Sequence, residues 1–228
     1  MKFDQRSFVG KSFRPLPDFQ INEGLKILSL LTAWGPTDQN NRVLDFLSQN
    51  YEEKFSDSEK TANYPKLESL SLGENRIRKL LLECNEWIFR ELNEKKRGQF
   101  AYELFCGNFE KNEFIFSQIG QPFVYLDREG LPLQSLGAPL DFSALLAHKA
   151  KRLAPLPSSL IGLYPDTHFS VFSLPLQAKD RVFFFCRDII PLEILQIPNQ
   201  KRNLDSFLEF FVSEDEKAPC WLGELSFE

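Results

Sequence analysis

Few residues of this chain have the types and spacing that chemistry needs. Acidic side chains that could hold a divalent cation lie in two places: Asp188 follows a strongly apolar run, and Glu214 and Asp215 belong to an acidic stretch near the C-terminus. Arg14 could bind a phosphate through its planar guanidinium without any metal. Plainer interpretations stay open: a solvated arginine, a turn or ion-pair role for Asp188, and a solvated acidic turn.

Histidine and cysteine offer little more. The chain has two histidines, His148 and His168, twenty positions apart with no Cys or carboxylate at metal-ligand spacing. Imidazole-based metal binding and a Ser-His-Asp triad are therefore disfavoured. The four cysteines are far apart, contain no CxxC pair and have apolar neighbours, which favours buried, reduced thiols over disulfides or a zinc site. They are Cys84, Cys106, Cys186 and Cys220.

The composition narrows the class of protein. The 228 residues include 32 acidic and 27 basic ones, a net charge of −5, which argues against nucleic-acid binding. No apolar run approaches the roughly 18 residues of a membrane span, and the N-terminus lacks the apolar core of a signal peptide. We expect one cytoplasmic domain over residues 1–228. Phe supplies 23 of the 31 aromatic residues, so these side chains must fill a large hydrophobic core or leave exposed apolar surface.

The elements that must position these residues follow from hydrophobic periodicity. Strands and helices cluster instead of alternating strictly, which predicts an α+β fold with antiparallel sheets. The run Val182 to Phe185 is too apolar for a strand with one wet face, so both faces of its sheet should be covered. Strands are predicted over 25–31, 99–106, 113–119, 123–126, 167–174, 181–186 and 220–227, and helices after Asp38 and over 73–96, 140–153 and 204–212.

In this order, the segments resemble the metal-dependent type 2C (PPM) protein Ser/Thr phosphatases over nearly the whole chain. The resemblance implies a four-layer αββα sandwich, in which two antiparallel β-sheets are flanked by helices. It rests on the order of short motifs, each weak alone. They are Val9-Gly10 with Arg14, Leu31-Thr32-Ala33-Trp34-Gly35-Pro36, Asn85, the stretch from Ile119 to Leu131, Leu160-Ile161-Gly162, the stretch from Asp180 to Asp188, and Glu214-Asp215-Glu216-Lys217.

The resemblance also implies which chemistry is missing. Phosphatases of this family use two Mg²⁺ or Mn²⁺ ions bridged by a water, held by several carboxylates. The bridging carboxylate of the family's Asp-Gly motif is replaced here by Ala33, and a second by Gln121. Asp188 and one of Glu214 and Asp215 would remain, as a vestigial metal pocket that holds no cofactor. Trp34, beside Ala33, would plug that pocket or is a plain core residue.

We therefore interpret the chain as a pseudophosphatase that acts in regulation, signalling or scaffolding through protein partners of unknown identity. The alternative is a divergent phosphatase for phosphomonoesters that rebuilt a Mg²⁺ or Mn²⁺ site from Asp188, Glu214, Asp215 and Asp18 or Asp38. A third hypothesis is a rigid subunit of a larger complex.

The 25 residues from Ile189 to Ser213 are shorter than the resemblance implies, which trims a region that flanks the family's active cleft. Their apolar side chains could be covered by a partner or by self-association, or could pack on the edge of the sandwich. They are Ile189, Ile190, Leu192, Ile194 and Leu195.

Overall fold

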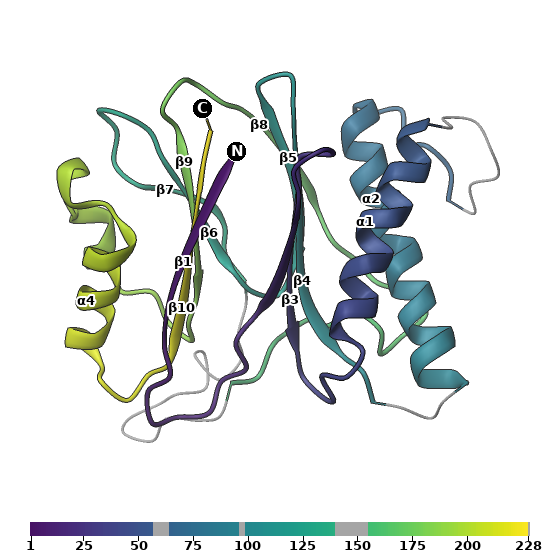
Figure 1. Ribbon diagram of the computed structural model, residues 1–228, viewed down its shortest axis with the longest axis horizontal. Helices are drawn as coiled ribbons and strands as arrows, with labels where there is room; N and C mark the ends of the chain where they lie inside the picture. The colour runs from purple at the N-terminus through teal and green to yellow at the C-terminus, as the bar shows by residue number, and fades with distance from the viewer. Residues whose placement is uncertain (57–63, 96–98, 140–154, 228) are drawn as a thin grey trace. The chain divides into compact units, whose positions relative to one another are not determined.

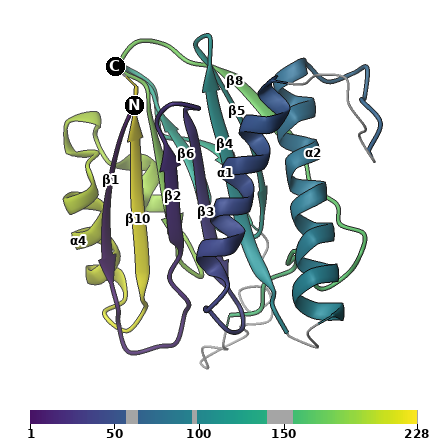
Figure 2. The same ribbon diagram turned by 45° about the vertical axis from the view of Figure 1, so that its right-hand side comes forward.

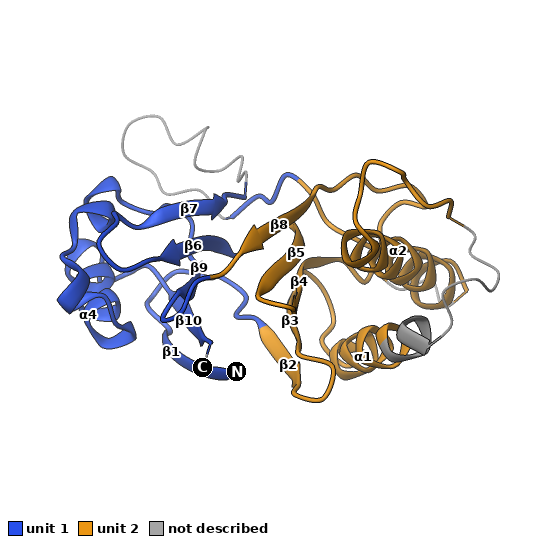
Figure 3. Ribbon diagram, turned by 90° about the horizontal axis from the view of Figure 1, so that it is seen from above, with its two compact units in different colours: residues 1–17, 120–158, 177–228 blue, residues 18–119, 159–176 orange. Residues whose placement is uncertain are grey.

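The computed structural model describes residues 1–227 except 57–63, 96–98 and 140–154, so the helix predicted over 140–153 lies outside the described residues. Within the described ranges the chain forms two antiparallel five-stranded sheets and three α-helices (Figure 1). It divides into two compact units (Figure 3). Unit 1 comprises residues 1–17, 120–158 and 177–228, and unit 2 comprises residues 18–119 and 159–176.

Unit 1 contains the first sheet, in which every neighbouring pair of strands is antiparallel. The strands lie in the order β1 (Lys2–Phe8), β10 (Cys220–Ser226), β9 (Arg181–Cys186), β6 (Phe123–Asp127) and β7 (Gln134–Gly137). Two short 3-10 segments, Leu192–Gln196 and Asn199–Lys201, lead into helix α4 (Leu204–Glu214). Asn203 begins this helix by accepting a hydrogen bond from the Ser206 amide at 2.9 Å.

Phenylalanine builds the core of unit 1. Phe183 and Phe185 on β9 point to one face of the sheet, where the Phe207 ring of α4 meets them edge-on at 4.9 and 5.1 Å. Phe184 points to the opposite face, and its ring lies 6.2 Å from that of Phe3. All three β9 phenylalanines are fully buried, which confirms that both faces of this strand are covered.

Unit 2 contains the second sheet, in the order β2 (Asp18–Asn22), β3 (Ile27–Ala33), β4 (Tyr102–Glu110), β5 (Glu113–Ile119) and β8 (Val171–Pro175). Helices α1 (Asn40–Ser56) and α2 (Leu72–Trp87) cover one face of this sheet (Figure 2). Their apolar stripes bury Leu47 and Leu81 against strand residues such as Leu31. Ser71 and Glu74 form the capping box at the start of α2. A π-helical segment, Ile88–Glu94, continues α2 at its other end.

The predicted fold class is confirmed: the chain is α+β, with two antiparallel sheets flanked by helices. Strands β1, β2 and β7 were not predicted, and each lies at an edge of its sheet, where exposed polar residues hide the apolar pattern. The strand predicted from residue 167 begins only at Val171, and the one predicted from residue 99 begins at Tyr102. No described helix is long and apolar enough to cross a membrane.

Candidate functional site

Arg14 and Asp188 form a buried ion pair in unit 1. Arg14 lies in the loop after β1, and Asp188 lies two positions beyond the end of β9. The Arg14 Nη1 donates a hydrogen bond to Asp188 Oδ1. The two side chains are 1% and 10% exposed. The guanidinium of Arg14 therefore faces the Asp188 carboxylate.

The loop that carries Arg14 is fixed by the turn after α4. The amides of Lys11 and Ser12 both donate to the Lys217 carbonyl oxygen, at 2.9 and 3.0 Å. Gly10 allows this approach, because it has φ of +64° and a Cβ on it would lie 2.6 Å from that same oxygen. The Val9-Gly10 motif thus has a structural role here: it lets the Arg14 loop pack on the acidic turn.

Glu214 and Asp215 end helix α4. Glu214 is exposed, whereas Asp215 is half-buried and its Oδ1 accepts a hydrogen bond from the Lys217 amide at 2.9 Å. The Asp215 amide in turn donates to the Phe211 carbonyl, which closes the helix. Across the part of the chain that the structure describes, no three His, Cys, Asp or Glu side chains are grouped to hold a metal ion.

Gln121 uses its side-chain amide to extend the pairing of β6 with β9. The register that places Phe123 opposite Phe185 puts position 121 opposite Arg187. The Gln121 Nε2 donates to the Arg187 carbonyl at 2.9 Å, and its Oε1 accepts from the Arg187 amide at 3.3 Å. Gln121 is buried, and it needs both a donor and an acceptor, which a carboxylate could not supply.

Arg187 is a buried residue whose role the sequence did not indicate. Its Nη1 donates to the Phe211 carbonyl at 2.9 Å, and its guanidinium lies 4.7 Å from the centre of the Phe211 ring. This carbonyl belongs to the last turn of α4, where a cation is favourable to the helix dipole. Arg187 therefore ties the end of β9 to the end of α4.

Ala33 and Trp34 lie in unit 2. Ala33 is the buried last residue of β3, opposite Tyr102 on β4. The Trp34 indole Nε1 donates to Glu103 Oε2 at 3.0 Å, and its amide donates to the Ala101 carbonyl at 2.8 Å. Trp34 is thus a half-buried residue fixed to β4, and the Ala33 methyl group offers no atom that could bind a metal.

The two further aspartates of the rebuilt-site hypothesis also have neighbours in unit 2. The Asp18 carboxylate accepts from Asn40 at 2.6 Å, and the Asp38 carboxylate accepts from Gln39 at 2.7 Å. The first of these hydrogen bonds joins the start of β2 to the start of α1, and the second lies just before α1.

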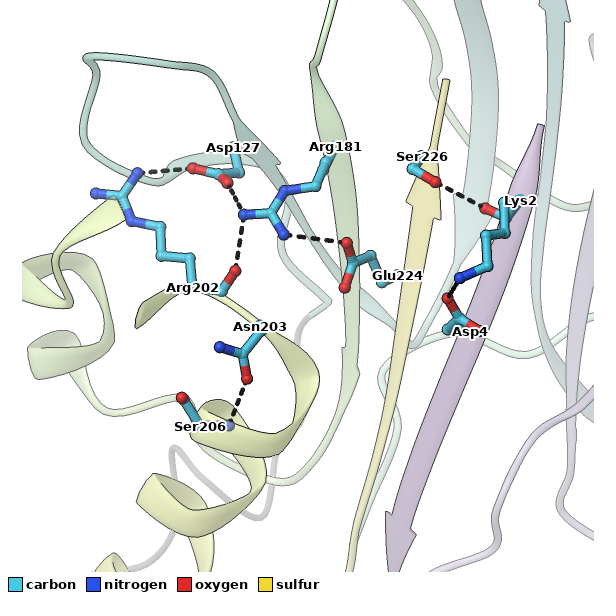
Figure 4. A network of polar contacts seen from close by, with 9 residues as sticks. All are labelled: Lys2, Asp4, Asp127, Arg181, Arg202, Asn203, Ser206, Glu224 and Ser226. Carbon is cyan, nitrogen blue, oxygen red and sulfur yellow. Dashed lines mark hydrogen bonds and ion pairs between the residues drawn. The ribbon is translucent and has the colours of Figure 1, made fainter. Parts of the chain in front are cut away.

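A second charged cluster in unit 1 was not anticipated from the sequence (Figure 4). Both oxygens of the buried Asp127 carboxylate accept from arginine: Oδ1 from Arg202 at 2.7 Å and Oδ2 from Arg181 at 2.6 Å. Arg181 also donates to Glu224 at 3.1 Å and to the Arg202 carbonyl at 2.7 Å. The cluster joins β6, β9 and β10 to the segment that precedes α4, so its role is to hold that segment in place.

The apolar run after Asp188 is only partly buried, and its packing on unit 1 is confirmed for three of its residues. Ile194 is buried in the core of unit 1, with Ile190 and Leu195 packed against it. Ile189 and Leu192, in contrast, are 55% and 77% exposed.

Solved structures show which fold this is. No family model and no curated protein matches the sequence. PppA, a key regulatory component of T6SS in Pseudomonas aeruginosa, aligns over 99% of this chain and 97% of its own, with 14% identity and a TM-score of 0.64. The serine/threonine phosphatase PstP of Mycobacterium tuberculosis aligns over 100% and 98%, with 15% identity and a TM-score of 0.64. MsPP, a PPM Ser-Thr phosphatase from Mycobacterium smegmatis, aligns over 100% and 99%, with 10% identity and a TM-score of 0.63.

This chain has the PPM-type Ser/Thr phosphatase fold. The resemblance inferred from short motifs is thereby confirmed at the level of the fold.

At the positions that the resemblance assigns to metal ligands, the residues that the structure describes do not fit the two-metal centre of this fold. The catalytic domain of PstP has been solved in complex with two manganese ions. Here the positions that the resemblance aligns with metal ligands hold a methyl group at Ala33, an amide engaged with Arg187 at Gln121, and a carboxylate paired with Arg14 at Asp188. Two divalent cations need shared anions between them, because their mutual repulsion is otherwise uncompensated.

Proposed function

We propose that this protein is a catalytically inactive PPM-fold protein that acts as a regulatory or scaffolding module through contacts with other proteins. The observation that carries the proposal is the buried ion pair between Arg14 and Asp188. It joins Arg14, the candidate phosphate-binding residue, to Asp188, the candidate metal ligand of the resemblance.

The ion pair opposes metal binding at Asp188. Two unit charges 4 Å apart interact by about 4 kcal/mol at an effective dielectric constant of about 20. A divalent cation on Asp188 would meet the Arg14 guanidinium at a comparable distance and would be opposed by about twice that energy. Unless Arg14 moved out of its buried position, the repulsion would cancel much of what one carboxylate contributes to binding.

The same pair opposes phosphate binding. The Arg14 side chain is only 1% exposed, and its Nη1 already donates to Asp188. A phosphate that reached this guanidinium would have to enter the buried site and lie beside the Asp188 carboxylate, so two anions would share one buried cation. Arg14 therefore stabilises the fold of unit 1 in our proposal and binds no substrate.

Surface residues next to the pair in sequence support a role in protein contacts. Phe13 precedes Arg14 and is 73% exposed, and Ile189 follows Asp188 and is 55% exposed. Val9, just after β1, and Leu192, at the start of the 3-10 segment after Asp188, are 73% and 77% exposed. In our proposal these side chains contribute to one contact surface, because contiguous exposed apolar patches mark interaction sites. PppA, which shares this fold, is described as a regulatory component of T6SS, and this supports a regulatory role in our proposal.

The test of inactivity is hydrolysis of a chromogenic phosphomonoester with millimolar Mn²⁺ or Mg²⁺, with an active PPM phosphatase as positive control. We expect no turnover above the metal-only blank, and the same result for an Asp188→Ala variant. Manganese-dependent turnover that Asp188→Ala abolishes would overturn the proposal and support the divergent phosphatase.

The test of protein contacts is affinity capture with the tagged full chain and with a Phe13→Ser/Leu192→Ser variant. We expect one stoichiometric partner that the variant no longer retains, because the substitutions remove apolar contact area without touching the core. A matched variant, Leu67→Ser, changes an exposed leucine of unit 2 and should retain the partner. Equal capture by all three proteins, or by none, would contradict the proposed surface.

A further inference from the structure

We draw no further inference here: the strongest candidate, the cavity of about 170 Å³ in unit 2 between the first turn of helix α2 and the turn that joins β4 to β5, carries nothing, because Glu110 and Glu113 line it beside Arg76 and Lys111 and nothing among the described residues points to a ligand beyond the helix N-terminus itself.

Discussion

The buried ion pair between Arg14 and Asp188 predicts a strong coupling that a double-mutant cycle can measure. Arg14→Met leaves the Asp188 carboxylate without its guanidinium, and Asp188→Asn leaves the Arg14 cation without its carboxylate. Because both side chains are almost fully buried, each single change should cost about 3–5 kcal/mol of unfolding free energy. The double variant removes both charges and should cost at least about 2 kcal/mol less than the sum of the two.

The assay is urea unfolding followed by far-UV circular dichroism and by tryptophan fluorescence. With a denaturant dependence of about 2 kcal/mol per M, each single change should lower the unfolding midpoint by about 2 M. If the two units unfold separately, the effect should appear in the transition of unit 1, which Trp221 reports.

The exposed ion pair of Lys11 and Glu216 provides the matched control. It starts from the same loop and joins it to the turn after α4, and its side chains are 71% and 73% exposed. Lys11→Met and Glu216→Gln should each cost less than about 1 kcal/mol, because solvent screens exposed pairs. Costs of that small size for Arg14→Met and Asp188→Asn, or strict additivity in their double variant, would refute the account of this ion pair.

Three further predictions concern other buried groups. Gln121→Glu should lower the unfolding free energy by about 1–3 kcal/mol in a thermal melt, because a carboxylate cannot donate to the Arg187 carbonyl; an unchanged melting temperature would contradict this. Asp127→Asn should speed amide exchange in the segment before α4, measured by mass spectrometry, since the guanidinium of Arg202 loses its charged partner. Burial raises the pKa of the Cys106 thiol to about 12. Above about pH 8.5 the Cys106 thiol loses its proton in the unfolded chain but keeps it in the folded chain. The free energy of unfolding should therefore fall as the pH rises beyond that value, and it should fall less in Cys106→Ser.

Sequence patterns were sufficient for the fold where periodicity is strong. The all-apolar strand around Phe184 was predicted at its observed bounds, and the long amphipathic stripe predicted as one helix is α2 continued by the π-helical segment that ends at Glu94. Strand β1 was missed because alternating charges at Lys2, Asp4 and Arg6 resemble a polar segment. Such a strand is defined by its backbone pairing with β10 and not by an apolar face.

The candidate site was predictable as a set of residues but not as contacts. Both Arg14 and Asp188 stood out from their local sequence, yet 174 positions separate them, and only the fold brings them together. The role of Gln121 depends on the register of β6 and β9, which one sequence does not reveal. Asp127 resembled a turn residue because the two arginines that bind it lie 54 and 75 positions away.

The most direct measurement of the central claim is manganese binding, because it does not depend on the choice of a phosphatase substrate. Mn²⁺ can be titrated into the full chain and the free ion followed by electron paramagnetic resonance, with Asp188→Ala and Arg14→Met alongside. Our account predicts no stoichiometric binding at up to millimolar Mn²⁺ in the wild type, since the guanidinium of Arg14 occupies the carboxylate of Asp188. Two bound Mn²⁺ ions per chain, lost in Asp188→Ala, would contradict it.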